Sequence, residues 1–408
     1  MGNTPKLRFE GFTDAWEQRK LYEYLDVSTE KNIEDVFTKQ DVLSVSGDFG
    51  IVNQIEFQGR SFAGASVSNY GVVNTGDVVY TKSPLNLNPY GIIKTNKGKP
   101  GIVSTLYAVY HPKENVDPAF VQTYFEQHAR MNNYMHPLVN KGAKNDMKVS
   151  SENALKGDVI FPSMDEQRQI VALFAKVDSI LTLHQRKCDA LTKAKTFYLQ
   201  NLFPQEGEKE PRLRLEGFTD SWNPYTLGDL YTERNERGNE TLQILTVSIH
   251  TGVSDGALEE DELGKSVRRS EDKTLYKHVY AGDLIFNMMR AWQGAIGVAK
   301  REGMISPAYI SAIPDERIYP PFMNYLLRRK EIISQINNLS YGVTDFRKRL
   351  YWDSFIKVKC CLPSVEEQKS ITDVFEQLDT LITRQEHRIK ALKTMKKFML
   401  QNMFAQEG

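Results

Sequence analysis

The feature that most constrains the fold of this 408-residue chain is an internal duplication. PKLRFEGFTDAW at residues 5–16 returns as PRLRLEGFTDSW at 211–222, with nine of twelve positions identical. FPSMDEQRQI at 161–170 returns as LPSVEEQKSI at 362–371. Two shorter pairs, GDVVYTK with GDLIFNM and LQNLF with LQNMF, repeat in the same order. A repeat of this kind predicts two copies of one module, each followed by one copy of a second element.

The two halves differ sharply between the matching blocks. Residues 26–75 share little with 232–281, and 82–150 share little with 288–351. One alternative is a tandem duplication that has drifted evenly. Even drift would not spare the last 40 residues of each half while erasing the middle. We infer that each variable segment binds something different.

The segments after Pro162 and Pro363 have the pattern of long helices. Each begins with a Ser-x-x-Glu capping box, and neither contains Pro or Gly. Apolar residues then recur at alternating spacings of four and three, which is a heptad pattern. Each helix should span about 38 residues, or roughly 57 Å.

The apolar stripes need a partner, and each helix can supply it for the other. We predict an antiparallel coiled coil in which His184 faces Gln385, Val177 lies near Leu392 and Leu191 lies near Leu378. The alternative is that each helix packs on its own module. The residues expected at the seam are Ile170, Val177, Leu181, His184, Leu191, Ile371, Leu378, Gln385 and Leu392.

The remaining segments predict an α+β fold, with two mixed α/β modules alternating with the two helices. Short β-rich runs are frequent, and helical stretches are expected at Pro118–Tyr134 and Pro320–Asn337. The expected divisions are a first module at 1–161, a helix and linker at 162–207, a second module at 208–362 and a second helix at 363–408.

The sequence carries no recognisable catalytic motif. It has no Gly-rich cofactor loop, no Walker A lysine motif and no His or Cys at metal-ligand spacing. We therefore expect no catalytic residue, cofactor or metal in this chain. The three cysteines form no CxxC pair, and no apolar run approaches 18 residues, so we expect a cytoplasmic protein without a membrane segment.

Basic residues gather on loops although Lys+Arg and Asp+Glu both total 52. Residues 265–301 alone carry eight basic and three acidic side chains. Cations interleaved with amides and aromatics are the groups that neutralise phosphates and read base edges. Arg290, Trp292 and Gln293 are the favoured base-reading residues, matched in the first half by Lys82, Asn86 and Asn88. The full set of candidate DNA-binding residues is Lys82, Asn86, Asn88, Tyr90, Lys141, Lys144, Arg268, Arg269, Arg290, Trp292, Gln293, Thr344, Arg347, Lys348 and Arg349.

Two variable modules alternating with two near-identical helices resemble the specificity subunit of type I restriction–modification systems. The resemblance is carried by the openings at 7–16 and 213–222, the Pro-Ser-x-x-Glu-Gln blocks at 162–167 and 363–368, and the helix ends at 199–203 and 400–404. It implies that each module is a target recognition domain for one half of a bipartite, asymmetric site in double-stranded DNA. It also implies that the helices set the spacer and dock two methyltransferase subunits, which help to recruit two motor-nuclease subunits. S-adenosylmethionine and ATP would then be bound by those partners. The alternative is a non-catalytic coiled-coil adaptor whose modules bind protein, which zero net charge mildly favours.

Overall fold

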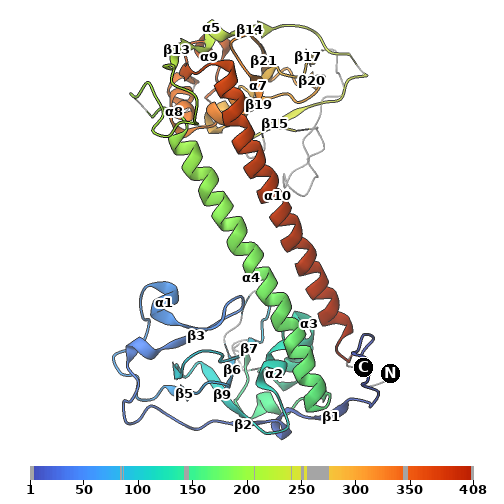
Figure 1. The fold of residues 1–408 in the computed structure, drawn as a ribbon. Helices are drawn as coiled ribbons and strands as arrows, with labels where there is room; N and C mark the ends of the chain where they lie inside the picture. The colour runs from blue at the N-terminus through green and yellow to red at the C-terminus, as the bar shows by residue number, and fades with distance from the viewer. Residues whose placement is uncertain are drawn as a thin grey trace. The chain divides into compact units, whose positions relative to one another are not determined.

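The computed structural model describes residues 4–82, 85, 87–141, 147–205, 207–239, 241–249, 252–254, 275–342 and 348–405. The chain forms two compact units. Unit 1 contains residues 1–185 and 387–408, and unit 2 contains residues 186–386. Each unit therefore holds one module together with parts of both long helices (Figure 1).

Unit 1 is built on a four-stranded sheet with the order β2-β9-β6-β7, in which all neighbouring strands are antiparallel. Three strand pairs, β1–β12, β3–β4 and β5–β8, and a small β10–β11 hairpin accompany it. The strands are β1 Glu17–Lys20, β2 Leu25–Val27, β3 Leu43–Ser46, β4 Gly50–Asn53, β5 Gly71–Val73, β6 Val78–Thr81, β7 Ile92–Thr95, β8 Gly101–Val103, β9 Tyr107–Pro112, β10 Asn140–Lys141, β11 Met147–Lys148 and β12 Asp158–Phe161. The helices are α1 Gln54–Gln58, α2 Pro118–Tyr124, α3 His128–Met135, the start of α4 Met164–Asn201 and the end of α10 Val365–Asn402.

Unit 2 has a sheet of the same design, with the order β14-β21-β18-β19. The pairs β13–β22, β15–β16 and β17–β20 complete its described strands. The strands are β13 Asn223–Thr226, β14 Tyr231–Arg234, β15 Thr246–Ser248, β16 Gly252–Ser254, β17 Lys277–Val279, β18 Leu284–Asn287, β19 Ile296–Val298, β20 Gly303–Ile305, β21 Tyr309–Pro314 and β22 Lys359–Leu362. The helices are the end of α4, α5 Leu227–Leu230, α7 Pro320–Leu326, α8 Lys330–Leu339, α9 Trp352–Phe355 and the start of α10.

The repeated Gly-Asp dipeptides form the turns that lead into the central strands β6 and β18. Gly76 and Gly282 both have φ +95°, a conformation that favours glycine. The Asp77 carboxylate accepts the Asn74 amide at 2.6 Å, and the Asp283 carboxylate accepts the Tyr280 amide at 2.8 Å. All four residues of each following strand are buried, as expected for a strand covered on both faces.

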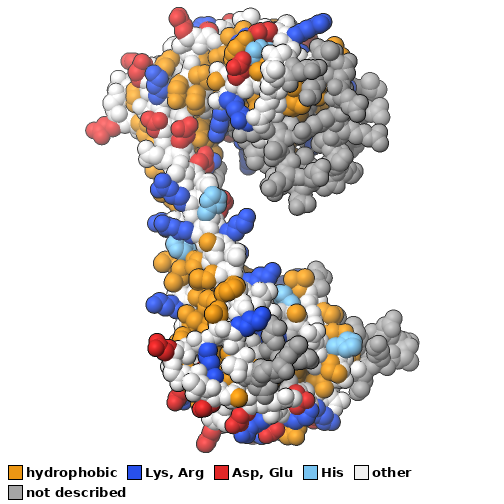
Figure 2. Space-filling model, turned by 90° about the vertical axis from the view of Figure 1, so that its right-hand side faces the viewer, with side chains coloured by type: hydrophobic (Ala, Val, Ile, Leu, Met, Phe, Trp, Pro, Cys, Tyr) orange, Lys and Arg blue, Asp and Glu red, His pale blue; other side chains and the backbone are white. Residues whose placement is uncertain are grey.

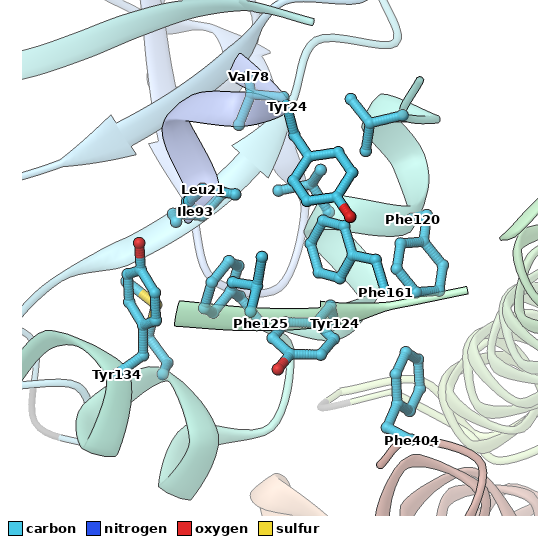
Figure 3. Packing of buried hydrophobic residues seen from close by; sticks show 14 of the residues in the cluster. Leu21, Tyr24, Val78, Ile93, Phe120, Tyr124, Phe125, Tyr134, Phe161 and Phe404 are labelled. Carbon is cyan, nitrogen blue, oxygen red and sulfur yellow. The ribbon is translucent and has the colours of Figure 1, made fainter. Parts of the chain in front are cut away.

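The ends of the long helices pack into the module cores. Phe404, just beyond α10, is 1% exposed and lies 5.7 Å from Phe120 and 5.8 Å from Tyr124 between ring centroids (Figure 3). Phe203, just beyond α4, lies 5.3 Å from Phe322 and 5.9 Å from Phe375 in unit 2. A module core is therefore completed by a helix end from elsewhere in the chain.

The predicted long helices are confirmed. Helices α4 and α10 each contain 38 residues, and every residue of the predicted heptad stripe is buried or half-buried. Inside unit 1, Lys396 of α10 pairs with Asp178 of α4 at 2.6 Å; inside unit 2, Lys195 of α4 pairs with Asp379 of α10. The coiled coil and the register that places His184 opposite Gln385 stay predictions.

The prediction of one helix at 118–134 and one at 320–337 was wrong in one respect, because each stretch forms two helices. In the first, α2 ends at Tyr124 and α3 begins at His128, after Gln127 adopts an extended ψ of 114°. In the second, Arg329 has ψ 149° between α7 and α8. Each break lets the buried side chain before it, Phe125 or Leu327, enter the module core.

Candidate nucleic-acid interface

Two loops in each module contain most of the candidate DNA-binding residues that can be placed. The strand-end loop follows the central strand, at residues 82–91 after β6 and at 288–295 after β18. The terminal hairpin follows the second module helix. It is β10–β11 in unit 1 and the strand bridge between Tyr341 and Arg349 in unit 2.

Main-chain and side-chain contacts connect the strand-end loop of each module to the residues around its second helix. In unit 2 the Leu350 amide, beside the terminal hairpin, donates to the Met288 carbonyl at 2.8 Å. In unit 1 the Asn132 side chain of α3 donates to the Leu87 carbonyl at 3.0 Å. The ring of Tyr90 lies edge-on to His136, in the short turn between α3 and β10, at 5.9 Å between centroids. In unit 2 the strand-end loop is therefore bonded to the residue beside the terminal hairpin, whereas in unit 1 the described contacts join the strand-end loop to α3 and to the segment that follows it.

The unit 2 surface presents charge and aromatic area next to each other. Arg290 and Gln293 are exposed on the strand-end loop. Trp292 is half-buried, and its indole N–H donates to the Met289 carbonyl at 2.9 Å. Trp292 therefore anchors the loop through that bond, while Arg290 and Gln293 are exposed. An exposed Arg held on a short anchored loop is suited to a bidentate contact with a guanine edge.

The terminal hairpin of unit 2 adds further cations. Arg349 is exposed, and Lys348 is half-buried. Tyr341, which the sequence reasoning did not select, is 52% exposed and lies 4.9 Å from the Tyr351 ring. The exposed ring of Tyr341 adds an apolar contact beside the charge of Arg349. Its only sequence signal was its place just before the Thr344–Arg349 run.

The unit 1 surface supports some candidates less well. Asn88 is 3% exposed, and its side chain bonds His128. Its main chain bonds Leu85 in both directions, so it works as a turn residue rather than a base reader. The Tyr90 carbonyl accepts the Tyr80 hydroxyl at 2.6 Å. Lys82 is half-buried, and burial lowers the pKa of its amine.

Several predicted site residues lie outside the described residues or have undescribed side chains. Lys141 is placed only by its backbone, in β10. The candidates outside the described residues are Asn86, Lys144, Arg268, Arg269, Thr344 and Arg347. Within the described ranges, no group of His, Cys, Asp and Glu could hold a metal ion, and no helix could span a membrane.

The repeated sequence blocks hold each module to a long helix. Arg8 makes a two-point ion pair with Glu166 of α4 at 2.7 and 2.8 Å. Arg214 makes the matching pair with Glu367 of α10 at 3.0 and 2.8 Å. Glu166 and Glu367 are the glutamates of the two expected capping boxes, so their carboxylates bind an arginine of the repeated opening block. In α10 the Glu367 amide also donates to the Ser364 hydroxyl at 3.3 Å, which is the serine half of a capping box.

The neighbouring glutamines close the same joints. The Gln167 side chain accepts the Asp117 amide at 2.9 Å and donates to the Pro162 carbonyl at 2.9 Å. The Gln368 side chain accepts the Tyr319 amide at 2.9 Å and donates to the Pro363 carbonyl at 3.0 Å. The shared blocks are therefore structural joints, while the divergent loops form the candidate interfaces.

Comparison with solved structures finds similar folds over nearly the whole chain. The S subunit of a type I restriction–modification system from M. genitalium has a TM-score of 0.60 and 13% identity, covering 99% of this chain and 100% of that one. The HsdS subunit from Thermoanaerobacter tengcongensis has a TM-score of 0.45 and 15% identity, covering 96% of both chains. A chain from a structural study of type I R-M complex assembly has a TM-score of 0.48 and 16% identity, covering 95% and 97%.

No protein-family profile and no curated protein matches this sequence. The likeness to the M. genitalium protein establishes a shared fold, consisting of α/β modules and long helices.

Proposed function

We propose that this chain is the DNA-recognition subunit of a type I restriction–modification complex. The observation that carries the proposal is the whole-chain fold shared with the M. genitalium S subunit. A single similar module would support only a common domain. Similarity over 99% of this chain extends to both modules and both helices, which is the organisation that a two-module recognition subunit requires.

Each module reads one half of a bipartite, asymmetric site in double-stranded DNA. The support is that the strand-end loops and terminal hairpins occupy matching places in the two sheets but carry different residues. The strand-end loop of unit 2 carries Arg290, Trp292 and Gln293, whereas that of unit 1 carries Lys82 and Tyr90. Different side chains at matching places are expected to read different half-sites.

The long helices set the spacer between the half-sites and dock two methyltransferase subunits. Exposed apolar side chains support the docking role, because a partner subunit can cover apolar area that the helices leave in solvent. Phe197 of α4 is 54% exposed, and Phe398 of α10 is 55% exposed at the matching position, 201 residues later. On the face drawn in Figure 2, hydrophobic and basic side chains mix on the exposed surface of the long helices. Two matching apolar positions suit two copies of one partner.

The chain itself performs no catalysis in this proposal. Methyl transfer, cofactor binding and ATP-driven restriction belong to the partner subunits. Its own contribution is sequence recognition and spacing, which need cations, amides and aromatic side chains rather than a nucleophile or an acid–base pair.

Salt-dependent DNA binding by the assembled complex tests the proposal against the adaptor alternative. The chain would be expressed with its methyltransferase and its affinity for duplex DNA measured between 50 and 200 mM salt. We expect a steep, linear fall of log affinity with log salt concentration, because bound cations displace counterions from phosphates. Weak binding that does not depend on salt would favour the protein-binding adaptor.

A further inference from the structure

A basic pocket lies in unit 2, apart from the candidate base-reading loops. Its volume is about 730 Å³, and the last turns of α4, β16, β19, α7 and the start of α8 line it. Lys195 and Gln200 contribute from α4, Val253 from β16, and Arg328 and Lys330 from the α7–α8 region. The pocket therefore lies where the last turns of α4 meet the second module.

Cations outnumber carboxylates in the pocket lining by six to two. Both carboxylates are already engaged, since Asp379 pairs with Lys195 and Glu331 lies 3.3 Å from Arg329. Lys300 and Lys330 are exposed at the rim, and neither makes an ion pair within the described part of the chain. Burial lowers the pKa of the Arg328 guanidinium, whose N–H donates to the Ile249 carbonyl at 3.0 Å. Arg212 pairs with Glu208, which lies outside the lining, so the positive charge that no described ion pair balances is carried by Lys300 and Lys330.

The polar lining favours a phosphate over a protein segment. The centre of a protein–protein interface is depleted in charge and built around apolar or aromatic anchors. Here Leu199, Val253 and Val298 are the aliphatic members of a lining that is otherwise almost entirely polar or charged. Lysines and arginines with amide neighbours are typical of wet contacts to phosphate groups.

The corresponding place in unit 1, where the last turns of α10 meet the first module, has a different balance of charge. Lys396, the counterpart of Lys195, lies 2.7 Å from Glu126 and 2.6 Å from Asp178. Two carboxylates therefore surround the lysine there, whereas Asp379 pairs with Lys195 in unit 2 and the hydroxyl of Tyr325 donates to that carboxylate at 3.1 Å. This difference predicts an anion site beside the end of α4 in unit 2 and none beside the end of α10 in unit 1.

We propose that this pocket binds a phosphodiester of the DNA backbone beside the half-site that the second module reads, with Lys300 and Lys330 at the rim and Arg328 in the wall. The inference rests on the proposed DNA-recognition function. It assigns the pocket a role in positioning the duplex, without contact to base edges.

The test uses the complex of this chain with its methyltransferase. The double variant Lys300→Ala with Lys330→Ala is compared with wild type and with the double variant Lys357→Ala with Lys369→Ala. The control removes two exposed lysines of the same unit that do not line the pocket. Affinity is measured for the specific duplex and for a scrambled duplex over a range of salt concentrations.

We expect the pocket variant to reduce the slope of log affinity against log salt by about 1 to 2, since each lost phosphate contact removes about 0.9. Specific and scrambled duplexes should lose affinity by the same factor, and the control should keep the wild-type slope. Phosphate ethylation should interfere with binding beside the second module's half-site in the wild-type complex, and this interference should weaken in the pocket variant.

A pocket variant with the same slope as the control would overturn the proposal. Weaker association with the methyltransferase at an unchanged slope would assign the pocket to an acidic protein segment instead. Pyrophosphate that raises the melting temperature of wild type but not of the pocket variant, again with an unchanged slope, would assign it to a small anion. Absence of salt-dependent DNA binding in wild type would instead count against the proposed function itself.

Discussion

At the scale of single residues, Arg290 offers the clearest test of base reading. It is exposed, while its neighbour Ala291 is fully buried and Trp292 is anchored through its indole N–H. We expect Arg290→Ala to weaken recognition of one half-site by about 1–3 kcal/mol, the usual value of a bidentate base contact. Competition binding with duplexes altered in one half-site at a time measures this effect. Arg290→Lys keeps the charge but loses the planar fork, so it should recover affinity without recovering specificity. Equal losses at both half-sites would show that Arg290 does not read bases.

A second residue-scale prediction concerns the buried ion pair between Arg214 and Glu367. The Glu367 side chain is 2% exposed, so loss of Arg214 would leave its carboxylate buried without that guanidinium. We expect Arg214→Ala to destabilise unit 2 by about 3–5 kcal/mol. The matched control is Arg212→Ala, which breaks the exposed pair with Glu208 and should cost less than about 1 kcal/mol. Hydrogen exchange of the β13 and β22 amides measures both changes. Similar exchange rates in the two variants would contradict the structural role of this joint.

Arg290 is exposed in the loop after a buried strand, and its role in reading bases stays a prediction. The burial of Asn88 could not be predicted, because it depends on His128, 40 residues away. The pairing of Arg8 with Glu166 spans 158 residues, and no spacing rule points to it. The repeated Arg and Glu were visible in the sequence, but only the fold joins them.

At the scale of elements, the long helices were predictable because a heptad pattern is a local signal. Their 38-residue lengths agree with the prediction, and the stripe residues are buried or half-buried. The breaks before α3 and α8 were not predictable from periodicity. At the second break, the Arg329 side chain donates to the Pro204 carbonyl at 2.8 Å, which is a contact with the distant end of α4.

The exposed faces of the helices give a prediction about partner binding. Phe197→Ala and Phe398→Ala remove rings that are more than half exposed, so the fold should be preserved. We expect each variant to weaken association with one methyltransferase subunit, and the double variant to weaken both. Native mass spectrometry of the co-expressed complex reports the number of subunits bound. Thr182→Ala, at an exposed position elsewhere on α4, is the control. If the double variant still bound both methyltransferase subunits, the two phenylalanine rings would not be part of the docking surface.

Helix length gives a second element-scale prediction. Inserting seven residues, about two turns, at matched points of α4 and α10 lengthens each helix by about 10 Å. At about 3.4 Å per base step, the spacer should grow by about three base pairs while both half-sequences stay the same. Methylation mapping reads both quantities. An unchanged spacer in a folded, active complex would mean that the helices do not set it.

At the scale of the whole molecule, each unit is assembled from distant parts of the chain. The Leu7 amide donates to the Asn402 carbonyl at 2.8 Å, so the two ends of the described chain meet in unit 1 (Figure 1). In unit 2 the Leu213 amide donates to the Asn201 carbonyl at 2.9 Å. The duplication predicted matching modules and helices. It could not predict which module each helix end completes, because either choice satisfies the same local pattern.

The most direct test of the account is a methylome. The chain would be expressed with its methyltransferase in a host without DNA methylation, and N6-methyladenine would be mapped across the genome. We predict one bipartite motif with two different half-sequences and a fixed spacer, which disappears when this chain is omitted. Absence of methylation despite an assembled complex, or a motif that persists without this chain, would contradict its assignment as the recognition subunit.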